Sequence, residues 1–407
     1  MHPTYRDAFD SAYTDDFYRD YLAALEQRLG VPIPFRVAET PFFIPRELRD
    51  RLAANARGVL DEVLQPDKVA QMKQAIPAHF DVPRMDAAPH CVQVDFAITQ
   101  REDGTLDGKV VELQAFPSLY ALMVIQRQVV VERMRAKMPG LDRDFSIYFG
   151  GLDEARFVER LREAIVAEED PEHVVLLDLH PEQQKTLPDF VATKQLLGVD
   201  SVCPTKLVRE GARLYREVGG KRVPVKRIYN RVVFDELERS KVELPFRYTD
   251  ELDVRWFSHP NWYWTISKFS LPLLRHASVP QARTLRELGR ELPTDLSNYV
   301  LKPLFSFAGA GVKVDVERAD IDAVPEDQRD GWLLQEKITY HPGIRMPDGN
   351  GVKAEVRMMF LRRDQDPKPE LVLNLVRLSR GKMLGVDQNR DLTWVGGSVG
   401  LFEEPGA

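Results

Sequence analysis

The spacing of apolar residues changes near residue 91, and this change constrains the fold more than any other feature of the sequence. Up to about residue 75, apolar and charged residues alternate at helical spacing, as in FYRDYLAALEQRL and RELRDRLAANARGVLDEVL, with proline-rich breaks between them. From Cys91 the sequence runs CVQVDFAIT, then a turn at REDGTLDG, then KVVELQAF, which predicts a β-hairpin. An N-terminal helical region is therefore followed by a region rich in strands.

The middle of the chain is typical of a parallel sheet. After a predicted helix over LYALMVIQRQVVVERMRAKM, the segment HVVLLDLHP forms a continuous apolar strand. TLPDFVATKQLLG predicts a helix and SVCPTKLV a further short strand. This alternation predicts a parallel α/β subdomain over roughly 150–235, with a small hairpin around Gly219 and Gly220.

The last third of the chain predicts a helix from about residue 265 and then antiparallel strands. The strand YVLKPL is followed by the loop SFAGAGVKV, the strand WLLQEKI, and the paired strands AEVRMMFL and ELVLNLVRLSR. The predicted class is α/β of the α+β kind. Four parts are expected, namely a helical region at 1–90, a hairpin and helix at 91–145, an α/β domain at 146–264 and a β-rich part at 265–407.

Composition excludes several classes of protein. The 407 residues include 43% hydrophobic and 29% charged residues, which is enough apolar material for a large core. A formal net charge of -7 argues against nucleic acid as the partner, because binding a phosphate backbone needs a basic excess. Neither a membrane span nor the apolar core of a signal peptide is present, so a cytoplasmic location is expected. Cys91 and Cys203 are interpreted as buried small hydrophobic residues.

Lys302 is the first candidate for a binding role. It ends an apolar strand just before a loop of small residues that contains Ser306, Gly309, Ala310 and Gly311. Backbone amides in such a loop can approach phosphate oxygens, and a nearby lysine supplies a positive charge for them. Neither the P-loop pattern nor the dinucleotide glycine pattern is present. On this segment alone, a solvated lysine at a hairpin is an equally good interpretation.

Other segments of the last third extend this candidate site. The strand around Gln335 begins with apolar residues and ends with polar ones. This pattern suits a site in which backbone groups bind the edge of an adenine ring and apolar side chains cover its faces. Lys268 lies at a predicted helix start, and Asn389 and Gly396-Gly397-Ser398 form another loop of small residues after the strand that carries Arg377.

At this point the chain resembles the ATP-grasp superfamily, and within it the circularly permuted group that includes glutathionylspermidine synthetase and the eukaryotic glutathione synthetases. The resemblance runs from about residue 91 onward and rests on several segments in the same order. It implies that ATP binds between two antiparallel sheets, with the α/β domain on the substrate side. It further implies ATP-binding roles for residues of three segments: Lys268; Lys302 with its glycine loop; and Gln335, Glu336, Lys337 and Ile338.

The hairpin that starts at Cys91 carries a candidate magnesium site. Glu112 and Gln114 share one face of their strand because side chains alternate, and Asp95 on the neighbouring strand can point the same way. Oxygen ligands of this kind suit Mg²⁺. The resembling family uses Asp-Phe-Ala and Glu-x-Asn here, so Gln114 replaces its asparagine. Without the family order, solvated hairpin carboxylates are the better interpretation.

Two positions depart from the family pattern. Gln93 stands where the family usually has an arginine, and Ala308 where it has a glutamate in the glycine loop. These changes remove a cation next to the transferring phosphoryl group and one metal ligand. Glu355 and Arg357, on one face of a later strand, could replace them, or could form a structural salt bridge. Gln93, Arg357 and Arg377 are the candidate catalytic residues, and Glu355 completes the candidate metal set.

Arg231 and Ser118 are the candidate substrate residues. Ligands of open α/β sheets bind beyond the carboxyl ends of strands, where Asp178, His180 and Arg231 fall. An arginine there would suit a carboxylate, whereas His180 is better interpreted as a capping or packing residue. Ser118 belongs to the retained family pattern Phe116-Pro117-Ser118.

The expected function is an ATP-dependent carboxylate-amine ligase that works through an acyl phosphate. Its substrates would be a small carboxylate and an amine, such as an amino acid, a peptide or a polyamine, and related enzymes are often homodimers. One alternative is an ATP-binding regulatory or scaffold protein with reduced or lost turnover, as Gln93 and Ala308 suggest. Phosphoryl transfer to an acceptor other than a carboxylate is a third possibility.

Overall fold

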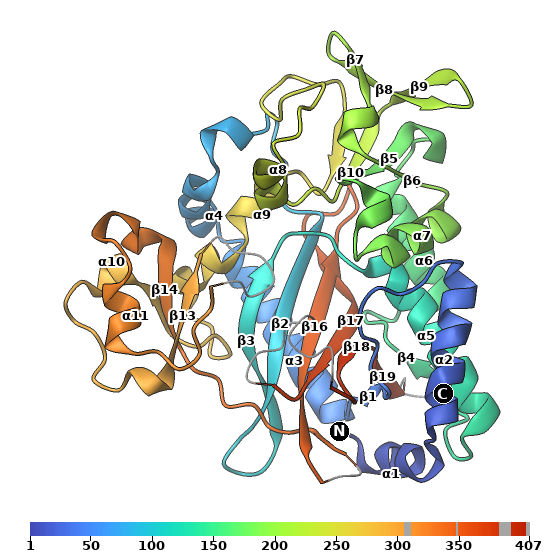
Figure 1. Cartoon of the computed structure of the whole chain (residues 1–407), viewed down its shortest axis with the longest axis vertical. Helices are drawn as coiled ribbons and strands as arrows, with labels where there is room; N and C mark the ends of the chain where they lie inside the picture. The colour runs from blue at the N-terminus through green and yellow to red at the C-terminus, as the bar shows by residue number, and fades with distance from the viewer. Residues whose placement is uncertain (305–310, 347–348, 382–391, 404–407) are drawn as a thin grey trace.

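The computed structural model describes residues 1–304, 311–346, 349–381 and 392–403, and its centre is a mainly antiparallel sheet in the order β18-β17-β16-β2-β3, with β15 paired to β16 (Figure 1). The predicted hairpin is confirmed as β2 and β3, and the predicted pair of C-terminal strands as β16 and β17. The strands of this sheet are β2 (Cys91–Gln100), β3 (Leu106–Gln114), β15 (Ile344–Arg345), β16 (Gly351–Leu361), β17 (Glu370–Ser379) and β18 (Gly396–Ser398).

One face of this sheet is apolar and is covered by helix α3 (Arg46–Val63). Alternation along β2 directs Phe96 toward this helix and leaves Asp95 on the opposite face. The packing is tight at Gly108 of β3, where a Cβ atom would lie 2.4 Å from Leu52 of α3 and 3.0 Å from Phe96. The opposite face of the sheet carries polar side chains, is not covered by α3, and is therefore the face on which a functional site is expected.

A second antiparallel sheet, in the order β12-β14-β13, forms a small lobe beside β3 (Figure 1). It has an apolar core of its own, which includes Leu285, Leu301 and Leu334. The predicted strands are confirmed, although the second one ends at Glu336 and does not reach Ile338. The lobe contains β12 (Ala282–Thr284), α10 (Leu285–Leu288), β13 (Tyr299–Pro303), α11 (Arg318–Asp322) and β14 (Trp332–Glu336).

The predicted parallel sheet is confirmed, with strands in the order β11-β10-β5-β6. The predicted hairpin at Gly219 and Gly220 is also present and pairs with a third short strand. Helix α6 was not predicted, although its amphipathic sequence signals it. The elements are α6 (Glu154–Ile165), β5 (Val174–Leu177), α7 (Leu187–Leu197), β6 (Asp200–Val202), β7 (Val208–Glu210), β8 (Arg213–Val218), β9 (Lys221–Val225), β10 (Arg227–Asn230), α8 (Phe234–Ser240) and β11 (Arg255–Phe257).

The N-terminal region is helical as predicted, and helix α5 packs between α2 and α7. A small sheet in the order β1-β19-β4 pairs the last described strand with two short strands from the first half of the chain. Within the described ranges, no helix is long and apolar enough to cross a membrane. The remaining elements are α1 (Pro3–Ala12), α2 (Asp15–Leu29), β1 (Phe42–Phe43), α4 (Pro66–Met72), α5 (Tyr120–Lys137), β4 (Phe145–Ser146), α9 (Asn261–Thr265) and β19 (Gly400–Glu403).

Two predictions of local structure were wrong. The helix expected from about residue 265 is a 3-10 segment, Lys268–Leu273, because a proline inside it removes a backbone donor. The segment Gly396-Gly397-Ser398 is not a loop, because it pairs with Val376–Leu378 of β17. Small residues are needed there for packing, since a Cβ atom on Gly396 would lie 2.2 Å from the carbonyl oxygen of Arg36.

Candidate active site

A cavity of about 1160 Å³ lies where the main sheet, the small lobe and the parallel sheet approach one another. Its walls come from segments far apart in the sequence, including β3, β14, β16 and β17. Most of the residues predicted from the sequence meet in this one space. Those that line it are Glu112, Gln114, Ser118, Arg231, Lys268, Lys302, Gln335, Glu336, Lys337, Ile338, Glu355, Arg357 and Arg377.

Lys302 is a buried cation with neutral hydrogen-bond partners. Its ammonium group donates to the side-chain oxygen of Gln335 at 2.7 Å and to the carbonyl oxygen of Val111 at 3.3 Å. Burial lowers the pKa of Lys302 to about 8, with Glu112 opposing the shift and the positive charge of Lys268 adding to it. The site therefore holds a positive charge that its own groups stabilise incompletely.

The side chain of Gln335 is fully buried and only half satisfied. Its oxygen accepts from Lys302, whereas its amide nitrogen has no hydrogen-bond partner among the residues that the structure describes. A buried donor without an acceptor costs about 1–3 kcal/mol. Because Gln335 lines the cavity, a ligand that offers an acceptor oxygen or nitrogen at this point would recover that energy.

Two backbone amides of the predicted adenine-binding segment form hydrogen bonds within the small lobe. The amide of Glu336 donates to the carbonyl oxygen of Gln281 at 2.9 Å, and the amide of Lys337 to that of Asn298 at 2.8 Å. The ammonium group of Lys337 lies 3.3 Å from a carboxylate oxygen of Asp315. These two amides are therefore not available to a base, and the side chain of Gln335 is the better donor toward a ligand.

Lys268 brings a second positive charge to the same cavity. It begins the 3-10 segment that Ser267 caps, and its side chain is buried. Burial lowers the pKa of Lys268, and the carboxylates of Glu112 and Asp235 oppose this shift. Two lysines with lowered pKa values in one cavity favour an anionic ligand, since an anion would restore the stability of both charged forms.

Across from the lysines, the polar face of the main sheet carries a network of charges. The strand register places Arg357 directly opposite Asp95, and the arginine donates to both carboxylate oxygens at 2.6 and 2.7 Å. Arg377 also donates to Asp95. Although burial raises the pKa of Asp95, the two guanidinium groups lower it below its ordinary value. Asp95 is therefore a charged carboxylate with both oxygens occupied.

Glu355 and Glu112 complete this network around Arg377. Glu355 is directly opposite Arg377 in the β16–β17 register and accepts from it at 2.8 Å. Glu355 also accepts from the hydroxyl group of Tyr340, and Glu112 lies 4.0 Å from the same guanidinium. Burial alone would lower the pKa of Arg377, but the surrounding carboxylates raise this pKa by a larger amount. The guanidinium group therefore remains charged.

This arrangement does not fit the predicted magnesium site. Among the residues that the structure describes, no group of three or more histidine, cysteine or acidic side chains is placed to hold a metal ion. Asp95 is occupied by two arginines, and the amide nitrogen of Gln114 donates to Gln93 at 2.8 Å. Magnesium as a cofactor stays a prediction that the structure does not test.

The predicted catalytic residue Gln93 does not line the cavity. It is fully buried beneath it, where its amide nitrogen donates to the carbonyl oxygen of Ser118 at 2.9 Å and its oxygen accepts from Gln114. The side chain therefore connects β2 to β3 and to the start of α5. This contact suits a positioning role more than contact with a reacting group.

Arg231 lines the cavity, but its guanidinium group is paired with Asp189 at 2.8 Å and lies between the rings of Phe116 and Phe190. The same Asp189 accepts from the backbone amides of Leu119 and Leu122 at the start of α5, each at 3.0 Å. The structure thus gives Arg231 a part in fixing that helix start beside Ser118. As it stands, the side chain does not present the open fork that a substrate carboxylate needs.

Several predicted residues lie outside the described part of the chain, namely Ser306, Ala308, Gly309, Ala310 and Asn389. Gly311 is described and has a positive φ of 74°, but it does not line the cavity, whereas Val312 and Val314 after it do.

One residue of the site was missed by sequence reasoning. Tyr340 lies two positions beyond Ile338, and its hydroxyl group donates a hydrogen bond to the carboxylate of Glu355. Asp178, a candidate because it follows an apolar strand, lines the cavity at the end of β5, and burial raises its pKa to about 7 despite the opposing charge of Arg231.

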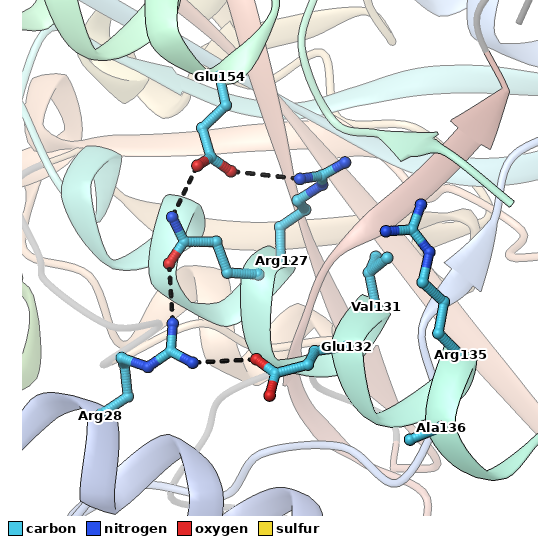
Figure 2. A pocket seen from close by; sticks show the side chains of 8 residues that line it. Arg28, Arg127, Val131, Glu132, Arg135, Ala136 and Glu154 are labelled. Atoms are coloured by element: carbon cyan, nitrogen blue, oxygen red, sulfur yellow. Dashed lines mark hydrogen bonds and ion pairs between the residues drawn. The ribbon is translucent and has the colours of Figure 1, made fainter. Parts of the chain in front are cut away.

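A second, shallower pocket of about 480 Å³ lies over α2, α5 and the start of α6. Figure 2 shows that its charges satisfy one another: Arg28 donates to Glu132 at 2.9 Å, and Arg127 and Gln128 donate to Glu154. Arg135, at the rim, pairs with Asp144. The network ties three helices together and, within the described part of the chain, pairs the charges that line this pocket, so we assign the site to the larger cavity.

Comparisons with known proteins identify the fold. Searches found no family model that matches the chain and no curated protein with a similar sequence. Among solved structures, the chain is similar to a glutathione synthetase-like effector from Globodera pallida in its apo form. The identity is 13%, the TM-score 0.52, and the match covers 90% of this chain and 95% of the other. The chain therefore shares the overall α+β fold of this effector.

Proposed function

We propose that this protein is an ATP-dependent ligase that activates a carboxylate and joins it to an amine. The observation that carries the proposal is the pairing, in one cavity, of two buried lysines with the unsatisfied amide of Gln335. The fold shared with a glutathione synthetase-like effector supports it. We further propose that the kinship lies with the circularly permuted ATP-grasp group, whose element order motivated the assignment.

The charges of the cavity suit a phosphate chain. Lys302 and Lys268 would bind the phosphate oxygens, because an anion beside them offsets the desolvation that lowers their pKa values. The Gln335 amide would donate to an acceptor atom of the nucleotide, and Ile338 and Val314 supply apolar surface for the base.

The chemistry then follows from positioning and charge. The substrate carboxylate attacks the terminal phosphorus of ATP, the bond to the bridging oxygen breaks, and ADP leaves. The amine next attacks the carbonyl carbon of the acyl phosphate, which releases inorganic phosphate and a proton and forms the amide. Arg357 and Arg377 lie on the opposite wall, where they stabilise the negative charge of the transferring group. Candidate substrates are amino acids, peptides and polyamines.

One observation favours a second function, a nucleotide-binding regulatory protein with little turnover. The carboxylate of Asp95, predicted as a metal ligand, is bound by two arginines, and Gln93 replaces the arginine of the family pattern. Such a protein would bind nucleotide in the same cavity and release no ADP.

Two measurements separate these functions. The first is the affinity of ATP, by calorimetry, for the wild-type chain, for Lys302→Met and for the control Lys194→Met, whose side chain is 67% exposed on the parallel sheet's side. The second is ADP release across a panel of amino acids, peptides and polyamines. Binding that is lost in Lys302→Met, with ADP formed only when a carboxylate and an amine are present, supports the ligase. Binding without ADP release favours the regulatory protein, and no binding refutes both.

A further inference from the structure

Three carboxylates on the polar face of the main sheet converge on one guanidinium group, that of Arg377. Its terminal nitrogen is within hydrogen-bond distance of Asp95, is 2.8 Å from Glu355 and is 4.0 Å from Glu112. The carboxylates come from β2, β16 and β3, so three separate strands direct oxygen ligands to one point. Carboxylate oxygens are the ligands that a hard divalent cation takes, although among the described residues no three acidic side chains are placed to hold one while Arg377 is present.

The register of the sheet explains why an arginine reaches this point. Arg377 lies directly opposite Glu355 across β16 and β17, and Asp95 lies diagonally beyond Glu355 on β2. Asp95 in turn faces Glu112 on β3. The long side chain of Arg377 crosses β16 to reach all three carboxylates.

The charge balance depends on this arginine. Asp95, Glu112 and Glu355 carry three formal negative charges, and Arg357 and Arg377 carry two positive ones. Arg357 binds Asp95 alone among these carboxylates, whereas Arg377 contacts all three. Without Arg377, these three carboxylates and Arg357 would keep a formal charge of about -2, and Lys302 and Lys268, which interact with Glu112 in the cavity, would be the remaining cations.

We propose that Arg377 takes the place of a divalent metal ion in this sheet, so that the native chain presents a guanidinium group to its ligand from a carboxylate cluster that holds no metal of its own. The inference goes beyond the proposed function and does not rest on it, because it concerns the nucleotide-free chain. It predicts that removing Arg377 creates a metal site.

The test is Mn²⁺ binding to the nucleotide-free protein, measured by electron paramagnetic resonance. We expect Arg377→Met to bind one Mn²⁺ ion at least about tenfold more tightly than the weakest binding that the assay detects, and the wild-type chain to stay below that limit. The matched control is Arg357→Met, which removes the same charge from the same face but leaves Arg377 in place. It is expected to show no gain. The double variant Arg377→Met/Glu355→Gln is expected to lose what the single variant gained.

Thermal unfolding covers the case in which the loss of Arg377 disrupts the fold. Millimolar Mn²⁺ is then expected to restore the cooperative transition of Arg377→Met, with no comparable shift for the wild type or for Arg357→Met. The proposal is overturned by three results: tight Mn²⁺ binding to the wild-type cluster, an equal gain in Arg357→Met, or neither binding nor rescue in Arg377→Met. Because no nucleotide is used, these results are independent of ATP turnover.

Discussion

The buried charge of Lys302 gives the sharpest quantitative prediction. The folded chain holds this lysine with a pKa of about 8, against an ordinary value of 10.5, because the ammonium group is desolvated. That difference corresponds to roughly 3 kcal/mol of lost stability at neutral pH. The side chain is 8% exposed, so solvent screening reduces this figure little.

The sign of the pH dependence follows from proton binding. Between about pH 8 and the ordinary pKa of lysine, the unfolded chain holds a proton at Lys302 that the folded chain has released. The free energy of unfolding therefore rises with pH in this window. Relative to Lys302→Met, which does not titrate, the wild-type chain should gain about 2 kcal/mol between roughly pH 7 and pH 9.5.

The assay is urea unfolding of both chains at these two pH values and constant ionic strength. Lys302→Met also leaves the side-chain oxygen of Gln335 without its donor, but this cost does not change with pH and cancels in the comparison. The exposed control Lys194→Met should show no comparable change. A difference between wild type and Lys302→Met that is constant to about 0.5 kcal/mol would refute the reasoning.

Three further predictions concern stability. Arg231→Met should lower the free energy of unfolding by about 3–5 kcal/mol in urea, because it leaves Asp189 buried without its cation; a loss below about 1 kcal/mol would contradict this. Gly396→Ala should lower the melting temperature by several degrees, since φ is 122° and the added Cβ meets the carbonyl of Arg36 2.2 Å away; an unchanged transition would argue against this packing. Burial alone would raise the pKa of Asp364, but hydrogen bonds from His90 and Arg227 lower it below the ordinary value. The stability that Asp364 contributes is therefore present above the ordinary pKa and is lost as pH falls through the pKa of the folded chain. Asp364→Asn should accordingly narrow its gap to the wild type in acid, as unfolding curves from neutral pH downward would show.

Local patterns in the sequence determined the pieces of the site. Alternation with period two places Glu112 with Gln114, and Glu355 with Arg357, on one face of a strand, and both pairs line the cavity. The apolar strand before Lys302 placed that lysine at the right position on β13. These features depend on neighbours in the chain, which is why the sequence by itself specifies them.

Partnerships between distant segments were decided by the tertiary structure. Arg357 meets Asp95 because β16 and β2 pair in one register, and a shift by one residue would turn one of them to the apolar face. Whether Arg231 was open to a substrate depended on Asp189 at the start of α7, and no local pattern indicates that pair. The sequence thus named the charged groups, but their pairing depends on strand register and packing, so only the folded chain shows that Arg377 lies among three of the predicted metal ligands.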